Sequence, residues 1–393
     1  MVWNQLTTTT TTTTRKRKSR QLLISELEEA EKNLPPLPDP HADPNDDFFR
    51  FLRRKLPVSV VHWMRDSGFS RWLQDTLLVF GIPAVLKAYP AALANFLHLS
   101  GVFVMPSSLS KKKELGDTDV SFKTVSYGSH PRQRMDCITL DTKSSHSNKP
   151  WIVFCHGGAW GSGQPWMYRL AALPFLAEGY NVCVWGYRTY PDGNVADQQH
   201  DLAMALQTLR QKYDPSHVAV VGHSSGSHIA LMTALTKPSS TSAVVDTIIL
   251  LSGVYDICAH YEWETARGID ELSPMKPACG THRSAWQEVS PTLLLQPSAL
   301  DDLVSTKASI NTEALPPILI LHGINDKVVP YTSAINVTKA FYGIDEDQSN
   351  VVQLQLLPTG HAELVLELMM GHGVTRSHVM GWLARYVDGP SKE

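Results

Sequence analysis

The chain has 393 residues, of which 43% are hydrophobic and 19% charged, so it can bury a substantial core in one large domain or two ordinary ones. Its formal net charge is −3, from 35 basic and 38 acidic side chains, which gives no reason to expect a nucleic-acid partner. The 5 cysteines are widely spaced and include no C-x-x-C pair, which argues against a zinc or redox motif and favours an intracellular, reducing compartment.

The first segment, residues 1–45, is set apart by composition. A run of threonines leads into the basic stretch that ends at Arg20, and a short amphipathic stretch and a proline-rich breaker run follow. We exclude this segment from the fold and expect a disordered low-complexity tail. An organelle transit peptide and a basic localisation signal are the alternatives.

Residues 46–114 form a second segment that we expect to be helical. Phe and Trp alternate with Arg and Lys in its first part, a composition suited to a lipid headgroup surface. Residues 77–105 then become apolar, with Lys87 as the one full charge, but prolines and polar residues interrupt them. A tilted span, a re-entrant hairpin and soluble helices that cover the next domain all remain open, and residues 46–105 are the candidate membrane contact.

From residue 115 to 393 the pattern alternates between strands and helices. Apolar strands are expected at residues 120–127, 134–140, 151–155, 181–187, 217–223, 247–253, 316–323 and 351–358. Helices are expected at 167–177, 196–213, 227–235 and 333–341, with a last helix that ends near Tyr386. The fold class is therefore α/β, with a mostly parallel sheet covered by helices on both faces.

The segment Gly222-His223-Ser224-Ser225-Gly226 falls between a predicted strand and a predicted helix. G-x-S-x-G in this position is the nucleophile elbow, in which a tight turn exposes the serine oxygen above the sheet. An ordinary glycine-rich turn is the alternative. We predict that Ser224 is a nucleophile.

A serine nucleophile needs a base and an acid, and two later strands supply both. Asp326 lies in the loop after the strand 316–323, and His361 lies in the loop after 351–358. The order Ser224, Asp326, His361 is that of an α/β-hydrolase. Taken singly, Asp326 is also consistent with an Asx-turn and His361 with a helix cap. Asp301 and Asp302 are rival acids, although the fold does not place an acid there.

The sequence Cys155-His156-Gly157-Gly158-Ala159-Trp160 ends the strand 151–155. Acyl transfer builds negative charge on a carbonyl oxygen, and each fixed backbone donor at that position contributes ~3 kcal/mol to transition-state stabilisation. The predicted oxyanion hole consists of the N–H groups of Gly157, Gly158, Ala159 and Ser225. We expect His156 to be structural and to form a hydrogen bond within its loop. A metal held by His156 and His322 is the alternative, but no third ligand stands at usable spacing, and no cofactor is expected.

Together these motifs resemble the hormone-sensitive-lipase-like branch of the α/β-hydrolases over residues 118–386. Within it, the stretches "YGSHPRQRMDCITL", "GYRTYPDG" and "SPTLLLQ" are similar to isoprenylcysteine α-carbonyl methylesterases. The resemblance implies a serine carboxylesterase whose substrate is a small lipophilic ester such as a prenylcysteine methyl ester, and an endomembrane-associated region ahead of the hydrolase domain, here residues 72–105. Two residues depart from the pattern: Ala159 stands where many members have a third glycine, and His223 where glutamine is common.

The cap insertion, about residues 255–314, is too long for a plain connection and is rich in aromatic residues. They are suited either to an apolar substrate pocket or to a small core of the cap itself. Three other functions stay open: an amidohydrolase, because "HGGAW" also resembles kynurenine formamidases; an inactive hydrolase fold that only binds; and a membrane scaffold.

Overall fold

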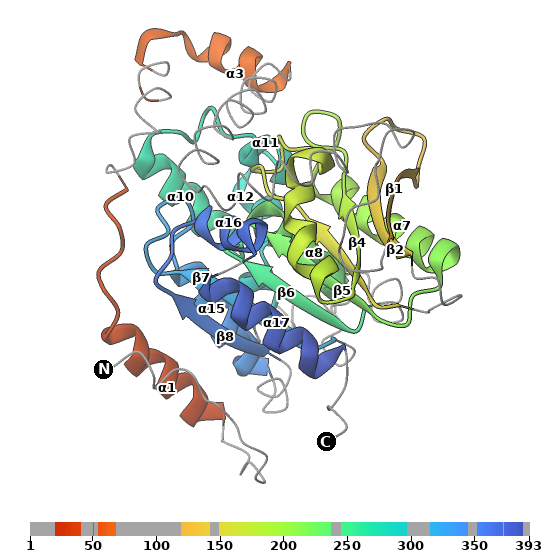
Figure 1. Ribbon diagram of the computed structural model, residues 1–393. Coiled ribbons are helices and arrows are strands. Elements are labelled where there is room, and N and C mark those ends of the chain that lie inside the picture. Colours follow the sequence, from red (N-terminus) through yellow and green to blue (C-terminus); the bar gives the residue numbers. More distant parts are fainter. Residues whose placement is uncertain are drawn as a thin grey trace.

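The computed structural model describes residues 20–40, 50, 54–67, 119–141, 149–236, 245–296, 315–344, 352–371 and 373–387. Eight strands form one sheet: β1 (Asp119–Ser126), β2 (Arg134–Asp141), β3 (Trp151–Cys155), β4 (Asn181–Trp185), β5 (Val218–His223), β6 (Thr247–Leu251), β7 (Ile318–Gly323) and β8 (Val352–Leu357). Their spatial order is β1-β2-β4-β3-β5-β6-β7-β8 (Figure 1). β1 and β2 pair antiparallel, as do β2 and β4, and all other neighbours are parallel.

Helices cover both faces of the sheet and complete three layers, as predicted. After the first strands come η2 (Pro165–Ala172), α6 (Leu173–Ala177), α7 (Val195–Tyr213), α8 (Ser225–Thr236), α15 (Thr332–Ile344), α16 (Glu363–Met370) and α17 (Val374–Tyr386). One face of the sheet packs on α7, α8 and α15, and the other on η2, α6, α16 and α17. This arrangement confirms the α/β-hydrolase fold class.

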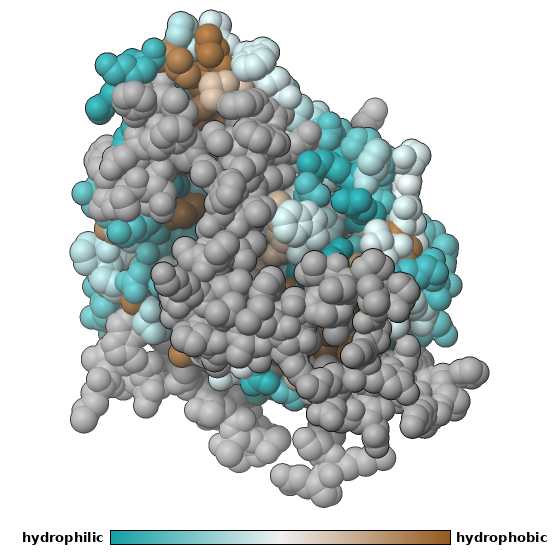
Figure 2. Space-filling view, turned by 45° about the horizontal axis from the view of Figure 1, so that its top comes forward, coloured by the Kyte–Doolittle hydropathy of each residue, from teal (hydrophilic) through white to brown (hydrophobic). Residues whose placement is uncertain are grey.

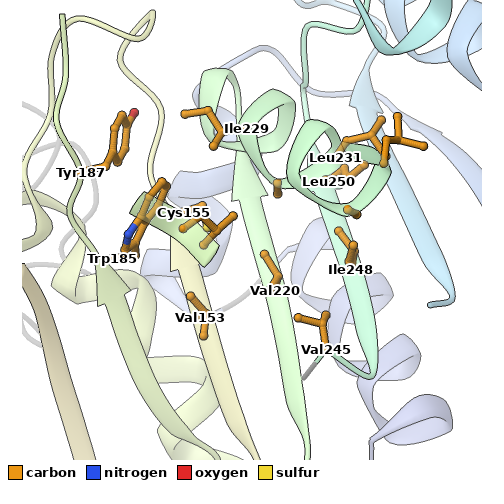
Figure 3. Packing of buried hydrophobic residues seen from close by; sticks show 14 of the residues in the cluster. Val153, Cys155, Trp185, Tyr187, Val220, Ile229, Leu231, Val245, Ile248 and Leu250 are labelled. Atoms are coloured by element: carbon orange, nitrogen blue, oxygen red, sulfur yellow. The ribbon is translucent and has the colours of Figure 1, made fainter. Parts of the chain in front are cut away.

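The core follows from the strand pleat, because successive side chains of a strand point to opposite faces. Val153 and Cys155 of β3 pack with Val220 of β5 and with α8, as Figure 3 shows. Ile152 and Phe154 pack on the opposite face, with α16 and α17. Every residue of β3 is buried, so the sheet is a rigid support for the loops that follow its strands.

Two predicted helices differ from the structure at their ends or in their continuity. The helix expected at 167–177 begins as the 3₁₀ segment η2 at Pro165 and becomes α-helical only in α6. The single last helix is divided into α16 and α17, because Gly371 and Gly373 adopt φ values of 71° and 100° that end one helix before the next begins.

Residues 20–40 correct the expectation of a disordered tail over residues 1–45. Arg20–Lys32 form helix α1, which packs against α15 (Figure 1). The Tyr331 hydroxyl donates a hydrogen bond to the carbonyl oxygen of Pro35, and Lys339 pairs with Glu31. The amphipathic stretch thus packs on the hydrolase domain, which composition alone did not reveal. Residues 1–19 and 41–45 lie outside the described residues.

Most of the segment 46–114 also lies outside the described residues, including the predicted membrane region 72–105. Its described part contains α3 (Val58–Asp66), which follows Pro57. His62 pairs with Glu271, and Asp66 accepts a hydrogen bond from the hydroxyl of Tyr190. In the described part of the chain, no helix is both long enough and apolar enough to cross a membrane.

The described part of the cap, residues 255–296, is largely helical. It contains α10 (Ile257–Arg267), α11 (Met275–Cys279), α12 (Arg283–Glu288) and α13 (Pro291–Leu294). Asp256 caps α10 by accepting a hydrogen bond from the N–H of Ala259, and Gly268 ends that helix in the left-handed conformation. The ring of Trp286 lies against Tyr261 within the main core, so these two aromatic residues belong to a core rather than to an open pocket. Residues 297–314 lie outside the described residues.

Candidate active site

Ser224 stands in the turn between β5 and α8, as the G-x-S-x-G pattern predicts. Its φ angle is 55°, a conformation that costs a residue with a side chain about 1–2 kcal/mol. Its N–H donates a hydrogen bond to the carbonyl oxygen of Leu251 on the neighbouring strand. A side chain at Gly226 would collide with the carbonyl oxygens of Cys155 and His156. The second glycine of the motif is therefore required by the close approach of α8 to the end of β3.

The structure brings Ser224, His361 and Asp326 together although they are far apart in the sequence. The Ser224 Oγ lies 3.0 Å from the Nε2 of His361. The Nδ1 of His361 lies 2.8 Å from the Oδ2 of Asp326. His361 follows β8, Asp326 follows β7 and Ser224 follows β5, so all three lie at the carboxyl ends of parallel strands, where open α/β sheets place their ligand sites.

Asp326 is fully buried and strongly hydrogen-bonded. Its Oδ1 accepts hydrogen bonds from the backbone N–H groups of Val328 and Val329, at 2.9 and 2.8 Å. Burial alone would raise the pKa of Asp326, but the charge of His361 and hydrogen bonds from His322 and His361 hold it well below its usual range. The carboxylate is therefore ionised at neutral pH and accepts a hydrogen bond from Nδ1 of His361. This bond leaves Nε2 of His361 to face Ser224.

The loop from Gly157 to Trp160 lies directly beside Ser224. A Cβ at Gly157 would lie 2.9 Å from the Cβ of Ser224, so only glycine allows this approach. The carbonyl oxygen of Gly158 accepts hydrogen bonds from the N–H groups of Gly161 and Ser162, which closes the loop into a turn. The four predicted donors are the N–H groups of Gly157, Gly158, Ala159 and Ser225. None of the four donates to another group within the part of the chain that the structure describes.

His156 is structural, as predicted. Its ring is fully buried, its Nδ1 forms a 2.8 Å hydrogen bond with the carbonyl oxygen of Gly157, and it stacks between Tyr168 and Tyr187. Burial lowers the pKa of His156 to about 4, although the bond to Gly157 opposes this shift, so the ring is neutral at neutral pH. Across the described ranges no three His, Cys, Asp or Glu side chains are placed to hold a metal ion.

Two histidines support the site in ways that the sequence patterns did not assign. The Nε2 of His322 donates to the carbonyl oxygen of Val329 and lies 3.4 Å from the Oδ2 of Asp326. The Nε2 of His223 donates to the carbonyl oxygen of His361 at 3.0 Å, so the variable position of the G-x-S-x-G motif holds the loop of the predicted base. The i,i+4 spacing of His322 and Asp326 was the one sequence signal available. The rival acids Asp301 and Asp302 lie outside the described residues.

Comparison with protein-family models gives a match to the central part of the chain. The model BD-FAE matches residues 136–341, just over half of the chain, which include Ser224, Asp326 and the loop 157–159. His361 lies beyond the matched range.

Three curated relatives are similar to this chain. The isoprenylcysteine alpha-carbonyl methylesterase ICME of Arabidopsis thaliana is 25% identical over 82% of this chain and 78% of the relative. Esterase LipC of Mycobacterium tuberculosis is 26% identical over 61% of this chain and 59% of the relative. The kynurenine formamidase of Salmo salar is 26% identical over 48% of this chain and 63% of the relative. Other plant methylesterases are aligned over about half of their own length.

Among solved structures, esterase B of Lactobacillus rhamnosis is similar with a TM-score of 0.53 and 17% sequence identity, over 77% of this chain and 94% of the other. At this identity the likeness concerns the fold.

Proposed function

This chain belongs to the BD-FAE family and is a carboxylic ester hydrolase, and from that premise we propose that it acts through an acyl-enzyme on Ser224. The observation that carries this proposal is the continuous hydrogen-bonded row Ser224 Oγ, His361 Nε2, His361 Nδ1 and Asp326 Oδ2, with distances of 3.0 and 2.8 Å. A serine hydroxyl is a weak nucleophile at neutral pH, and this row supplies the base that it needs.

In the acylation step, Oγ of Ser224 attacks the ester carbonyl carbon while Nε2 of His361 takes the hydroxyl proton. The carbonyl oxygen becomes negatively charged and accepts hydrogen bonds from the backbone N–H groups of Gly158, Ala159 and Ser225. The buried carboxylate of Asp326 stabilises the imidazolium that forms. His361 then gives the proton to the departing alkoxide, and the alcohol leaves.

In the deacylation step, His361 takes a proton from water, and the resulting hydroxide attacks the acyl carbon. The second tetrahedral intermediate is held by the same N–H groups, and it collapses when His361 returns the proton to Oγ of Ser224. The products are a carboxylic acid and free enzyme. No metal or organic cofactor is needed for either step.

For the substrate we propose a lipophilic ester such as a prenylcysteine methyl ester. The support is the similarity to the plant methylesterases, one of which aligns over 78% of its length. The kynurenine formamidase relative aligns over a smaller share of this chain, which favours the ester over the N-formyl substrate. An ester and a formamide go through the same tetrahedral chemistry, so substrate assays decide between them.

Turnover assays with the full-length chain test the proposal. We expect kcat/KM for S-farnesylcysteine methyl ester to exceed that for cysteine methyl ester and that for N-formylkynurenine, each by at least about tenfold, because the prenyl group adds apolar burial. Ser224→Ala is the matched control and should reduce every rate by about a thousandfold or more.

Equal rates for the prenylated and unprenylated esters would contradict the proposal of a lipophilic substrate but leave the serine mechanism intact. Preference for N-formylkynurenine would show that the substrate is a formamide and not an ester. Turnover that survives in Ser224→Ala would exclude the serine mechanism itself.

For localisation we propose contact with a membrane surface through the segment that contains α3. Val58 and Trp63 of α3 have 56% and 62% of their surface exposed, and the cations Arg54 and Lys55 are exposed next to them. Apolar side chains gather at the upper margin of Figure 2, at the end of the molecule to which α3 belongs. Exposed apolar side chains beside cations suit an anionic lipid surface.

Sedimentation with vesicles that contain phosphatidylserine tests this contact. Trp63→Ser should reduce the bound fraction several-fold, because the ring no longer enters the lipid interface. Trp166→Ser is the matched control, since Trp166 is 40% exposed on η2, and it should bind like the wild type. Equal binding of the two variants would contradict the contact at α3.

A further inference from the structure

The loop that carries the proposed oxyanion donors contains two consecutive non-glycine residues in the left-handed conformation. Ala159 has a φ of 49° and Trp160 a φ of 60°. This conformation is unfavourable for a residue with a side chain, so the loop keeps this shape only if other contacts hold it. The contacts that hold it therefore decide where the N–H groups of the loop point.

Trp160 is the fixed point of this loop. Its ring is 1% exposed, and its Nε1–H donates a 3.1 Å hydrogen bond to the Nδ1 of His228. Its carbonyl oxygen accepts hydrogen bonds from the side chain of Gln198, at 2.9 Å, and from the N–H of Tyr190, at 2.8 Å. Both ends of the residue are thereby tied to other elements of the domain.

His228 connects this tryptophan to the proposed nucleophile and to the cap. It lies on α8, where its N–H donates to the carbonyl oxygen of Ser224 at 3.2 Å. Its Nε2 donates to the carbonyl oxygen of Val289, in the cap, at 2.7 Å. The ring is fully buried and meets the Trp160 ring edge-on.

The hydrogen bonds define which tautomer of His228 is present. A carbonyl oxygen only accepts, so Nε2 of His228 carries the proton; an indole N–H only donates, so Nδ1 is the acceptor. Burial lowers the pKa of His228 to about 4, although the bond to Val289 opposes this shift, so the ring is neutral at neutral pH. A neutral ring in this tautomer is the form that accepts from Trp160.

We propose that His228 is a positioning residue that holds the oxyanion loop in its donating shape by accepting the hydrogen bond of Trp160. The inference rests on the proposed function, because it assigns a task to the loop only if the loop binds an oxyanion. His228 itself does not touch the substrate. Its effect reaches the reaction through the position of the N–H groups of Gly158 and Ala159.

Two substitutions separate the two hydrogen bonds of His228. In His228→Asn, the amide oxygen takes the place of Nδ1 and still accepts from Trp160, but nothing reaches Val289. In His228→Gln, the amide nitrogen takes the place of Nε2 and still donates to Val289, but Trp160 loses its acceptor. Trp160→Phe removes the donor and keeps an aromatic ring. His200→Gln, at an exposed histidine of α7, is the matched control.

The readout must distinguish a displaced oxyanion loop from a weakened fold. We would measure kcat and KM for an ester, the thermal midpoint, and two inhibition constants. A trifluoromethyl ketone adds to Ser224 and presents an oxyanion, whereas the product acid binds without one. A loop effect lowers kcat and weakens the ketone in parallel, while KM and inhibition by the acid stay within about twofold.

We expect His228→Gln and Trp160→Phe to lower kcat and ketone affinity by at least about tenfold each, and His228→Asn to retain kcat within about threefold of the wild type. His228→Gln activity equal to that of the His200→Gln control would overturn the inference while the serine mechanism stands. A loss in both His228 variants that follows a lower thermal midpoint or a raised KM would show a structural role only and overturn it too. A wild-type chain no more active than Ser224→Ala would overturn the proposed function and this inference with it.

Discussion

At Asp326, a second histidine acts beside His361. The Nε2 of His322 donates to the carbonyl oxygen of Val329 and also lies 3.4 Å from the Oδ2 of Asp326, and His322 has no exposed surface. Its contribution to the site is one donor to a buried carboxylate, and hydrogen bonds to charged groups contribute about 1.5–3 kcal/mol.

We predict that His322→Leu lowers kcat by about tenfold or more, because the carboxylate of Asp326 loses a donor and becomes less firmly oriented. His322→Gln places an amide N–H near the position of Nε2 and should recover most of the rate. Steady-state kinetics of the two variants, with circular dichroism to verify folding, provide the comparison. Equal rates for the leucine and glutamine variants would show that the donor has no effect.

Gly226 is the residue at which the nucleophile turn depends most on the absence of a side chain. The position of its missing Cβ is occupied by backbone carbonyl oxygens of Cys155 and His156, which cannot rotate away. We predict that Gly226→Ala destabilises the fold by about 2–4 kcal/mol and lowers kcat. Gly381→Ala in α17 is the control, since a Cβ there meets no atom within 4 Å, and urea unfolding of the two variants is the measurement. A Gly226→Ala chain as stable as the control would contradict the close approach.

The residues of the candidate site could be predicted from the sequence where a motif lies at the end of a strand. Contacts between segments that are far apart in the sequence could not be predicted. Ser224, Asp326 and His361 each follow an apolar strand, so chain order and strand ends were enough to bring them to one edge of the sheet. Trp160 and His228 are 68 residues apart, and no pattern links them. Their hydrogen bond depends on the angle at which α8 leaves the nucleophile turn, which only the folded chain determines.

At the scale of elements, α1 is a helix that we did not expect, because its amphipathic stretch lies in a segment of low-complexity composition. Its neighbour Leu34 packs against Ile324, Tyr331 and Ile335, a small cluster at the edge of the domain. The central strands and the helices between them were predicted because each carries its own apolar run and the two kinds of element alternate along the chain. Helix α1 follows a low-complexity run, and its partner surface on α15 lies about 300 residues later in the chain.

We predict that removal of residues 1–40 destabilises the domain by about 1–3 kcal/mol, because it uncovers this apolar cluster, and leaves kcat/KM within about twofold. Glu31→Gln, which removes only the partner of Lys339, should cost less than about 1 kcal/mol because the pair is partly exposed. Denaturant unfolding of both chains checks this difference. Unchanged stability after the truncation would contradict the packing of α1 on α15.

At the scale of the whole molecule, buried neutral histidines govern stability in acid. Burial lowers the pKa of His156 and His228 to about 4 and that of His223 to about 3, from the usual 6.5. As the pH falls below 6.5, the unfolded chain binds protons at these rings and the folded chain does not. Stability is therefore fully present above pH 6.5 and is lost as the pH falls toward 4.

We predict that the free energy of unfolding falls steeply between pH 7 and pH 5, by about 1–2 kcal/mol for each of these histidines. Asp326 adds a further loss below about pH 4, where the unfolded carboxyl becomes protonated while its folded pKa is lower still. Urea titrations at several pH values provide the measurement, repeated at high salt to screen the net charge. A free energy of unfolding that is constant from pH 7 to pH 5 would show that the rings are protonated in the folded chain.

The most direct measurement on the whole enzyme is covalent labelling with a fluorophosphonate, followed by peptide mass spectrometry. If Ser224, His361 and Asp326 act as a functional hydrogen-bonded triad, each chain should carry one adduct, on Ser224. The adduct should form rapidly in the wild type and at least about a hundredfold more slowly in His361→Asn. An ester-hydrolysing chain that carries no adduct on Ser224, or one that labels equally fast in His361→Asn, would contradict the proposed acyl-enzyme mechanism.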